Sequence, residues 1–260
     1  MNHMKHNTPP LATAARYARQ IALPEIGPEG QAKLRQSRAL VVGAGGLGSP
    51  ALLYLAAAGV GVLGVADSDT ASASNLNRQI LYSENDLGTA KTDAALDRLR
   101  RLNSDLTIVT HPVRLTTANA AAIIAEYDVI VDCVDSLAAR SLINHAALAA
   151  GRDVVEAGIE GFHGFVLSVR RGTACAACVQ PAPAPDGAFP PLCGGEAGSP
   201  VFGPAAGVAG CLQAAECVKL LLGIGKPLFS RLLLFDVLRM EFDELPLSPA
   251  PDCPVCGAYR

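Results

Sequence analysis

Short, continuously apolar runs alternate along the chain with segments whose apolar residues recur at helical spacing. These runs predict strands at Ala39–Val42, Val60–Ala66, Leu106–His111, Val129–Cys133 and Asp153–Ala157. The segments between them predict helices near Pro50–Ala58, Lys91–Leu102, Ala118–Glu126 and Ala138–Ala150. Apolar strands joined by helices are typical of a parallel sheet that is covered by helices on both faces. The pattern therefore predicts an α/β, Rossmann-like fold with a mostly parallel sheet.

The pattern changes after Gly161. The stretches "FHGFVLSVRRG" and "RLLLFDVLRMEFDEL" predict antiparallel extensions of the sheet, and "AAGVAGCLQAAECVKLLLG" predicts a buried helix between them. The stretch "QPAPAPDGAFPPLCGGEAGSP" is rich in Pro and Gly, which predicts a mobile loop over about residues 179–200. We find no linker or internal repeat in residues 16–260, so we expect a single domain there, preceded by a disordered tail over residues 1–15.

Composition and charge narrow the class of protein. The chain has 260 residues, is 50% hydrophobic and carries a net charge of −3, so it can bury a large core but offers no basic surface for nucleic acid. Gly and charged residues interrupt every apolar run before it reaches the roughly 18 residues of a membrane span. The first residues lack the apolar region of a secretory signal. We therefore expect a cytoplasmic protein with no membrane or nucleic-acid partner, in which disulfides do not explain the eight cysteines.

The stretch "ALVVGAGGLGSPALLYLAAAGVGVLGVADSD" combines a strand, a glycine turn, a helix, a second strand and an acidic end. Gly43, Gly45 and Gly48 satisfy the pattern GxGxxG, and Asp67 follows about 20 residues later. In dinucleotide-binding proteins this acid binds a ribose hydroxyl, and the helix N-terminus behind the turn favours phosphate. The stretch therefore predicts a nucleotide site. Two simpler interpretations stay open, namely a purely structural glycine turn and a capping role for Asp67.

Charged residues follow the strands that end near this turn. Asn75, Arg78 and Lys91 come after the second strand. A triphosphate under attack needs such a clamp, because adenylyl transfer depends on positioning and charge neutralisation, whereas a nicotinamide cofactor does not. The alternative is that Arg78 and Lys91 are surface charges at a helix entry. No GxxxxGK[ST] motif is present, so a P-loop does not account for ATP. "DVIVDCVDS" places Asp132 and Asp135 at the end of the fourth strand, where a carboxylate suits Mg²⁺ beside phosphates.

Cysteine spacing is the strongest single signal. "CAAC" supplies Cys175 and Cys178, and "CPVC" supplies Cys253 and Cys256 close to the C-terminus. Two CxxC pairs in a cytoplasmic chain fit four thiolates around a structural Zn²⁺, a closed site with no open position for catalysis. A pair of redox dithiols is the alternative.

The remaining cysteines fall into two groups. Cys133, Cys211 and Cys217 lie in apolar strand or helix patterns, which predicts that they are small core residues. Cys193 lies in the Pro- and Gly-rich stretch, where a thiol is accessible. It is either an incidental exposed cysteine or a reactive one.

These motifs in this order resemble those of the ThiF/MoeB/HesA family, bacterial relatives of the ubiquitin-activating enzymes. The resemblance runs through "RYARQIALPEIGPEGQAKL", "GAGGLGSP", "DSDTASASNLNRQ", "DLGTAK", "DCVDS", "CAAC" and "CPVC", which span nearly the whole chain. It implies an ATP-dependent adenylyltransferase that adenylates the C-terminal Gly of a ubiquitin-like sulfur carrier and releases pyrophosphate. "DCVDS" departs from the family's usual "DCTDN" at Val134 and Ser136 but keeps Asp135.

The resemblance also implies roles for single residues. Gly46, next to Gly43 and Gly45 of the glycine turn, would lie against the nucleotide, and Asp67 would bind its ribose. Asn75, Arg78 and Lys91 would contact the phosphates, and Asp135 would orient Mg²⁺. Ser74 matches the family's small polar residue before Asn75. Arg19 would reach the triphosphate from the other subunit of a homodimer. Family members differ over a covalent bond between a loop cysteine and the carrier, so Cys193 is a possible sulfur or thioester acceptor.

The implied partners are therefore a second copy of the chain, a carrier that ends in Gly-Gly, and a separate sulfur donor. Two other classes stay open. A non-catalytic scaffold would keep the fold and the zinc cysteines without turnover. An NAD-dependent oxidoreductase would explain the glycine turn and Asp67 but would leave Arg78, Lys91 and the CxxC pairs without a role.

Overall fold

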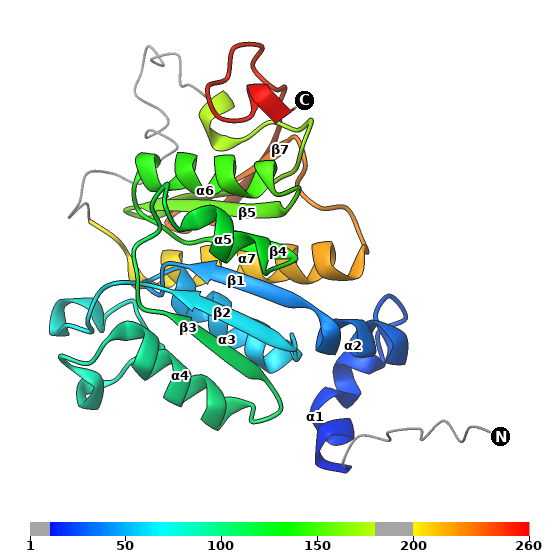
Figure 1. The fold of residues 1–260 in the computed structure, drawn as a ribbon, viewed down its shortest axis with the longest axis vertical. Helices are drawn as coiled ribbons and strands as arrows, with labels where there is room; N and C mark the ends of the chain where they lie inside the picture. Colours follow the sequence, from blue (N-terminus) through cyan, green and yellow to red (C-terminus); the bar gives the residue numbers. More distant parts are fainter. Residues whose placement is uncertain (1–10, 180–199, 260) are drawn as a thin grey trace.

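The computed structural model describes residues 11–179 and 200–259, and one eight-stranded sheet runs through them (Figure 1). The strands are β1 (Arg38–Val42), β2 (Val62–Ala66), β3 (Thr107–His111), β4 (Val129–Asp132), β5 (Asp153–Glu160), β6 (His163–Val169), β7 (Arg231–Asp236) and β8 (Glu241–Pro246). Their order across the sheet is β3-β2-β1-β4-β5-β6-β7-β8. Neighbours from β3 to β5 are parallel, and neighbours from β5 to β8 are antiparallel. The predicted Rossmann-like sheet with an antiparallel extension is confirmed.

Helices cover both faces of this sheet. They are α1 (Leu11–Ile21), α2 (Gly27–Gln36), α3 (Gly48–Ala58), α4 (Lys91–Leu102), α5 (Ala120–Ala125), α6 (Leu137–Ala149) and α7 (Gly203–Leu222). α3, α4 and α7 contribute to one apolar core, while α5 and α6 contribute to a second core with the C-terminal segment. Figure 1 shows α5 and α6 in front of the sheet and α3 and α7 behind it. Because both faces are covered, the central strands β1 and β4 are buried almost throughout, which explains their continuous apolar runs.

One predicted sheet extension is confirmed in more detail, and one predicted boundary differs from the structure. "RLLLFDVLRMEFDEL" forms the hairpin β7–β8, because the Asp236 carboxylate accepts hydrogen bonds from the backbone N–H groups of Leu238 (2.8 Å) and Arg239 (3.2 Å) and turns the chain. α1 begins at Leu11, so the last part of the segment that we predicted as a tail is helical. Residues 1–10 and nearly all of the predicted mobile loop lie outside the described residues.

α7 is long and apolar enough to span a membrane by length and composition, and it is the one such helix in the described ranges. It packs instead inside the protein, against α3, β5 and β6. The apolar character of α7 therefore reflects its place in the core, as the sequence pattern predicted.

The connections between the parallel strands create a switch point in the middle of the sheet. From β1 the chain proceeds to β2 and β3 on one side, and then returns to β4 and β5 on the other side. In open α/β sheets, ligands bind outside the carboxyl ends of the strands at such a point. The ends of β1 at Val42, β2 at Ala66 and β4 at Asp132 therefore mark the place to look for a site.

Candidate active site

A cavity of about 690 Å³ opens at this switch point, at the carboxyl ends of β1, β2 and β4. Most of the nucleotide residues that we predicted line it, namely Gly43, Gly45, Gly46, Asp67, Arg78, Lys91 and Asp135. Three predicted residues do not line it: Ser74 and Asn75 lie in the short helical turn Ala73–Asn75 beside Arg78, and Arg19 lies on α1. Cys193 lies outside the described residues.

The glycine turn is required by close packing as well as by any ligand. Gly43 has φ of +92°, and a Cβ at this residue would lie 2.7 Å from the carbonyl oxygen of Cys133. A Cβ on Gly48 would lie 1.9 Å from the carbonyl oxygen of Gly43. The turn therefore has the tight geometry of the fingerprint, and the backbone at Gly45 and Gly46 faces the cavity.

Two side chains hold the peptide groups of Ala44 in this turn. The Asp67 carboxylate accepts the Ala44 N–H at 2.8 Å, and the Tyr82 hydroxyl donates to the Ala44 carbonyl at 2.7 Å. Burial, followed by the charge of Asp67, raises the pKa of Tyr82 well above its usual value, so the hydroxyl keeps its proton. Asp67 thus holds the glycine turn and does not cap α3, which begins at Gly48 without a side-chain cap, and it also lines the cavity. Sequence reasoning missed Tyr82, whose only sign was an aromatic residue in a polar stretch.

Lys91 is the first residue of α4 and is only 5% exposed. Its Nζ lies 3.1 Å from Oδ2 of Asp69 and 3.9 Å from Oδ2 of Asp67. An ammonium group that is nearly buried beside two carboxylates in a cavity wall is not a solvated surface charge. This geometry removes the alternative interpretation for Lys91.

Arg78 packs against the glycine turn at Gly46. A Cβ on Gly46 would lie 3.5 Å from Cγ of Arg78, so the stem of this arginine packs against the turn. Its guanidinium donates to the carbonyl of Ser74 (2.9 Å) and to Oδ1 of Asn77 (3.0 Å). Ser74 and Asn77 therefore hold the guanidinium group at the cavity wall.

The two carboxylates that we predicted at the end of β4 have different environments. Asp135 is exposed and lines the cavity. Asp132 is fully buried, and its carboxylate accepts hydrogen bonds from Nε of Arg140 (3.0 Å) and the backbone N–H of Val134 (3.1 Å). Burial raises the pKa of Asp132 and the charge of Arg140 opposes this rise. Of the two, only Asp135 is placed to hold Mg²⁺ beside a nucleotide.

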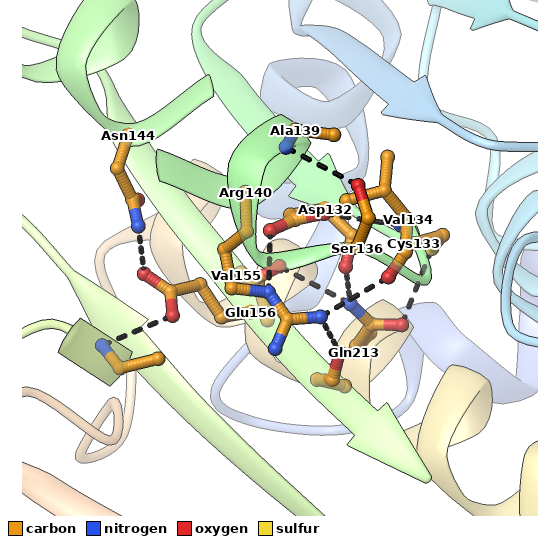
Figure 2. Close-up of polar contacts among 12 residues, drawn as sticks. Asp132, Cys133, Val134, Ser136, Ala139, Arg140, Asn144, Val155, Glu156 and Gln213 are labelled. Carbon is orange, nitrogen blue, oxygen red and sulfur yellow. Dashed lines mark hydrogen bonds and ion pairs between the residues drawn. The ribbon is translucent and has the colours of Figure 1, made fainter. Parts of the chain in front are cut away.

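Buried polar side chains fix the loop that carries Asp135 (Figure 2). Arg140, from α6, also donates through Nη2 to the carbonyls of Val134 (3.1 Å) and Ala157 (2.6 Å). Gln213, from α7, donates to the carbonyls of Asp132 (2.6 Å) and Val155 (3.1 Å). Helices from both faces of the sheet therefore hold the backbone on which Asp135 is mounted. Neither Arg140 nor Gln213 could be identified from the sequence, because each is a single polar residue in an apolar helical pattern.

Replacing Arg140 by Met should destabilise the protein by about 3–5 kcal/mol, because it leaves the Asp132 carboxylate buried without its charged partner. Urea unfolding measures this change. The matched control is Arg101→Met, which removes the exposed partner of Asp97 and should cost at most about 1 kcal/mol. Equal effects of the two substitutions would show that the buried pair has no special structural role.

The four predicted zinc ligands come together. The Sγ atoms of Cys175, Cys178, Cys253 and Cys256 all lie within 4.8 Å of one another. The Cys175–Cys253 distance of 3.7 Å and the Cys178–Cys256 distance of 3.3 Å are too long for disulfide bonds of about 2.05 Å. They are close to the spacing of about 3.8 Å that a tetrahedron with Zn–S bonds of about 2.3 Å requires. The cluster is therefore suited to a metal ion.

A buried carboxylate connects this cluster to the sheet. Glu156, on β5, accepts hydrogen bonds from Asn144 of α6 and from the backbone N–H of Ala176, which follows Cys175 (3.1 Å for Ala176) (Figure 2). Burial raises the pKa of Glu156 to about 7. The first CxxC turn is thus anchored to the strand next to β4.

The other cysteines follow the prediction in part. Cys133 and Cys217 are buried, and Cys211 is half-buried on α7. Burial raises the pKa of Cys133 well above its usual value. Although Cys133 borders the cavity, its thiol donates to Oε1 of Gln213 (3.2 Å), so its role is structural.

A Rossmann-like sheet with a cavity at its switch point, lined by a glycine turn and charged side chains, is typical of a nucleotide-binding protein, and the separate cluster of four cysteines could hold a metal ion. The sequence profile of the ThiF family matches residues 17–255, and the chain belongs to this family. The resemblance on which we based the site residues is therefore confirmed at the level of the family.

Comparisons with known proteins agree with this assignment. The chain is 46% identical over 248 residues to the "Sulfur carrier protein adenylyltransferase" of Thermus thermophilus, covering 93% of this chain and 90% of that protein. It is 41% identical to the "SAMP-activating enzyme E1" of Haloferax volcanii, covering 93% and 88%. Among solved structures, E. coli MccB with ATP superposes with a TM-score of 0.77 at 23% identity, covering 93% of this chain and 74% of that chain. The last likeness shows a shared fold.

Proposed function

We propose that this protein is an ATP-dependent adenylyltransferase that activates the C-terminal Gly of a ubiquitin-like sulfur carrier. The observation that carries the proposal is the cavity wall itself: Lys91, Arg78 and Asp135 surround one cavity together with the glycine turn and Asp67. The positive charges of Lys91 and Arg78 can bind a triphosphate, and the exposed carboxylate of Asp135 can bind the Mg²⁺ ion that accompanies it. The relatives named as a sulfur carrier adenylyltransferase and a SAMP-activating enzyme support the choice of carrier.

In the proposed reaction, an oxygen of the carrier's terminal carboxylate attacks the α-phosphorus of ATP. A new acyl–phosphate bond forms, the bond between the α-phosphorus and the bridging oxygen of the β-phosphate breaks, and pyrophosphate leaves. No general base is needed, because a carboxylate is ionised at neutral pH. Arg78 and Lys91 stabilise the charge that develops on the phosphates, and Asp135 would hold Mg²⁺, which neutralises phosphate charge when bound. The acyl adenylate is then consumed by a sulfur nucleophile from a separate donor.

Lys91 requires a rearrangement of charge when ATP binds. Its Nζ is already within ion-pair distance of Asp67 and Asp69. A phosphate group near Lys91 would compete with these carboxylates, while Asp67 would accept a ribose hydroxyl. In the free protein, the two carboxylates hold the ammonium group of Lys91 in place before the nucleotide arrives. This lowers the entropy cost of ordering the side chain when ATP binds.

We also propose that the four-cysteine cluster holds a structural Zn²⁺ and that the enzyme works in the cytoplasm. The four cysteines Cys175, Cys178, Cys253 and Cys256 would supply four thiolates, which complete a tetrahedral zinc site and leave no open position, so the metal would stabilise the fold and take no part in the reaction. A reducing compartment keeps such thiols available for a metal.

The active unit that we propose is a homodimer. Figure 1 shows α1 and α2 at the amino end of β1, whereas the cavity lies at the carboxyl end of the same strand. Arg19 is exposed on α1 and does not line the cavity of its own chain. A two-fold dimer would let this arginine serve the partner's cavity.

Mixing two inactive variants tests this arrangement. Arg19→Ala and Asp135→Ala should each abolish carrier-dependent ATP–pyrophosphate exchange, and a mixture that forms heterodimers should recover about a quarter of wild-type activity. One of the two sites in each heterodimer then has both residues intact. A mixture that stays inactive, although mass spectrometry detects heterodimers, would contradict the shared site.

Calorimetry separates the proposed function from the oxidoreductase alternative. The protein should bind Mg-ATP and should not bind NAD, because Arg78 and Lys91 provide charge for three phosphates. If the protein bound NAD tightly and did not bind ATP, the oxidoreductase alternative would be supported instead. The scaffold alternative predicts ATP binding without any pyrophosphate exchange, so the two measurements together distinguish all three.

Cys193 belongs to the later half of the reaction in this proposal, as a possible sulfur or thioester acceptor. Its place is a prediction from the sequence alone, since it lies outside the described residues. Because carboxylate attack on ATP needs no thiol, Cys193→Ser should keep pyrophosphate exchange. Loss of exchange in a folded Cys193→Ser protein would move this residue into the first half.

A further inference from the structure

Gln79 is a buried polar residue in the cavity wall whose side-chain amide makes no hydrogen bond within residues 11–179 and 200–259. It follows Arg78 in the chain, lines the cavity and is 5% exposed. Its Oε1 is buried without a hydrogen-bond partner among the described residues. Nε2 makes no hydrogen bond to these residues and is not one of their buried unpaired atoms, so it is the accessible end of the amide in the cavity wall. Burying an amide without partners costs free energy, so native proteins seldom leave one in this state. An unpaired amide in the wall of a cavity therefore indicates a group that binds there.

The amide has a fixed position beside the glycine turn. A Cβ on Gly45 would lie 3.6 Å from Nε2 of Gln79, so the amide is in contact with the second glycine of the fingerprint. The backbone of Gln79 donates to the carbonyl of Asn75 (2.9 Å) and accepts from the N–H of Tyr82 (3.1 Å). Tyr82 in turn holds the carbonyl of Ala44. Tyr82 therefore joins the turn that carries Gln79 to the glycine turn, and the backbone of Gln79 is held in place before any ligand binds.

Its surroundings indicate which part of a ligand it meets. The second glycine of GxGxxG is the point at which the backbone approaches phosphates. Arg78 packs along Gly46, the next residue of the turn, and Lys91 lines the same cavity. The ribose side is occupied by Asp67, whose carboxylate lies on the end of β2. An amide N–H between a glycine turn and two cations is placed to donate to an anion.

We propose that Gln79 is a nucleotide-binding residue that donates its side-chain N–H to a phosphate oxygen of ATP beside Gly45. The assignment rests on the proposed function, because ATP is the ligand in both. It adds a neutral donor to the charged residues Arg78 and Lys91. A neutral donor holds the phosphates in one orientation without adding to the positive charge that must later release pyrophosphate.

Gln79→Met tests the proposal, because methionine has nearly the same shape but no hydrogen-bonding group. Calorimetry should show that Mg-ATP binds at least about tenfold more weakly, while adenosine binds within a factor of two of its wild-type affinity. The melting temperature of the free protein should stay the same or rise, since an unpaired buried amide has been removed. A purely structural glutamine would instead lower the melting temperature.

Gln79→Glu and a matched control complete the experiment. Gln79→Glu removes the donor and places a carboxylate next to the phosphates. It should therefore weaken the binding of Mg-ATP more than Gln79→Met does and leave the affinity for adenosine unchanged. Gln36→Glu makes the same change of charge at an exposed position at the end of α2 and should not alter ATP binding.

The possible results separate the two claims. Wild-type protein that binds ATP, together with Gln79→Met protein of equal ATP affinity, would overturn only the role of Gln79. If Gln79→Met weakened the binding of ATP and of adenosine equally, the phosphate contact would be overturned, since Gln79 would then contact the base or the ribose. Wild-type protein that binds no ATP would overturn the proposed function and this assignment together.

Discussion

Asp135→Asn is expected to reduce carrier-dependent ATP–pyrophosphate exchange at least about 100-fold, since a metal ion contributes several kcal/mol of charge stabilisation in phosphoryl chemistry. Asp135 is the exposed carboxylate at the end of β4, and it lines the cavity while its neighbour Asp132 is turned into the core. The substitution keeps the size of the side chain and removes the charge that would hold Mg²⁺ in the proposed reaction. Its effect on stability should be small, because no described residue pairs with the Asp135 side chain.

Two observations distinguish a metal role from a general loss of structure. Raising the Mg²⁺ concentration should partly restore exchange in Asp135→Asn, because the site is weakened and not blocked. Asp97→Asn, an exposed substitution on α4, should retain full exchange. Undiminished exchange in Asp135→Asn would show that the Mg²⁺ ligand lies elsewhere.

Loss of the metal from the cysteine cluster should have the second large effect. Structural zinc sites contribute about 10–16 kcal/mol of binding free energy in small domains. Even a fraction of this coupled to folding should lower the melting temperature by about 10 °C, at about 2–4 °C per kcal/mol for a chain of this size. The two CxxC turns come from the segment after β6 and from the C-terminal segment, so the metal would join distant parts of the chain.

Elemental analysis and thermal unfolding test this expectation. The wild-type protein should contain about one Zn²⁺ per chain, and Cys256→Ser should contain little and melt earlier. Cys211→Ser is the control, because Cys211 is half-buried on α7 and lies outside the cluster. A metal-free protein with disulfides between these cysteines, or a Cys256→Ser protein as stable as wild type, would contradict a structural zinc site.

Much of the fold could be predicted because its signals are local. The parallel strands β1, β2 and β4 are buried almost throughout and are continuous apolar runs in the sequence, and the glycine turn between β1 and α3 has a fixed spacing. The hairpin β7–β8 was harder to predict, because its turn at Val237–Met240 continues the mixed apolar and charged pattern of the strands. The capping carboxylate of Asp236 sets this turn, and nothing in the sequence distinguished that aspartate from others.

The site could be predicted only where its residues follow a motif. Lys91, Arg78 and Asp135 were identified from motif positions, and the structure brings them to one cavity. Asp132 and Asp135 look equivalent in "DCVDS", because a sequence does not show which carboxylate turns inward. That choice is made by Arg140, which lies eight residues further along the chain in the apolar pattern of α6. Tyr82 was missed for the same reason, since its role depends on a carbonyl 38 residues away in the chain.

Carrier-dependent ATP–pyrophosphate exchange tests the central claim most directly. Labelled pyrophosphate should be incorporated into ATP only when the protein is mixed with a ubiquitin-like carrier that ends in Gly-Gly. A carrier that lacks its terminal Gly should give no exchange, because the attacking carboxylate no longer reaches the α-phosphorus beside Arg78 and Lys91. Exchange that is independent of the carrier, or its absence with every Gly-Gly carrier although Mg-ATP binds, would contradict the proposed activity.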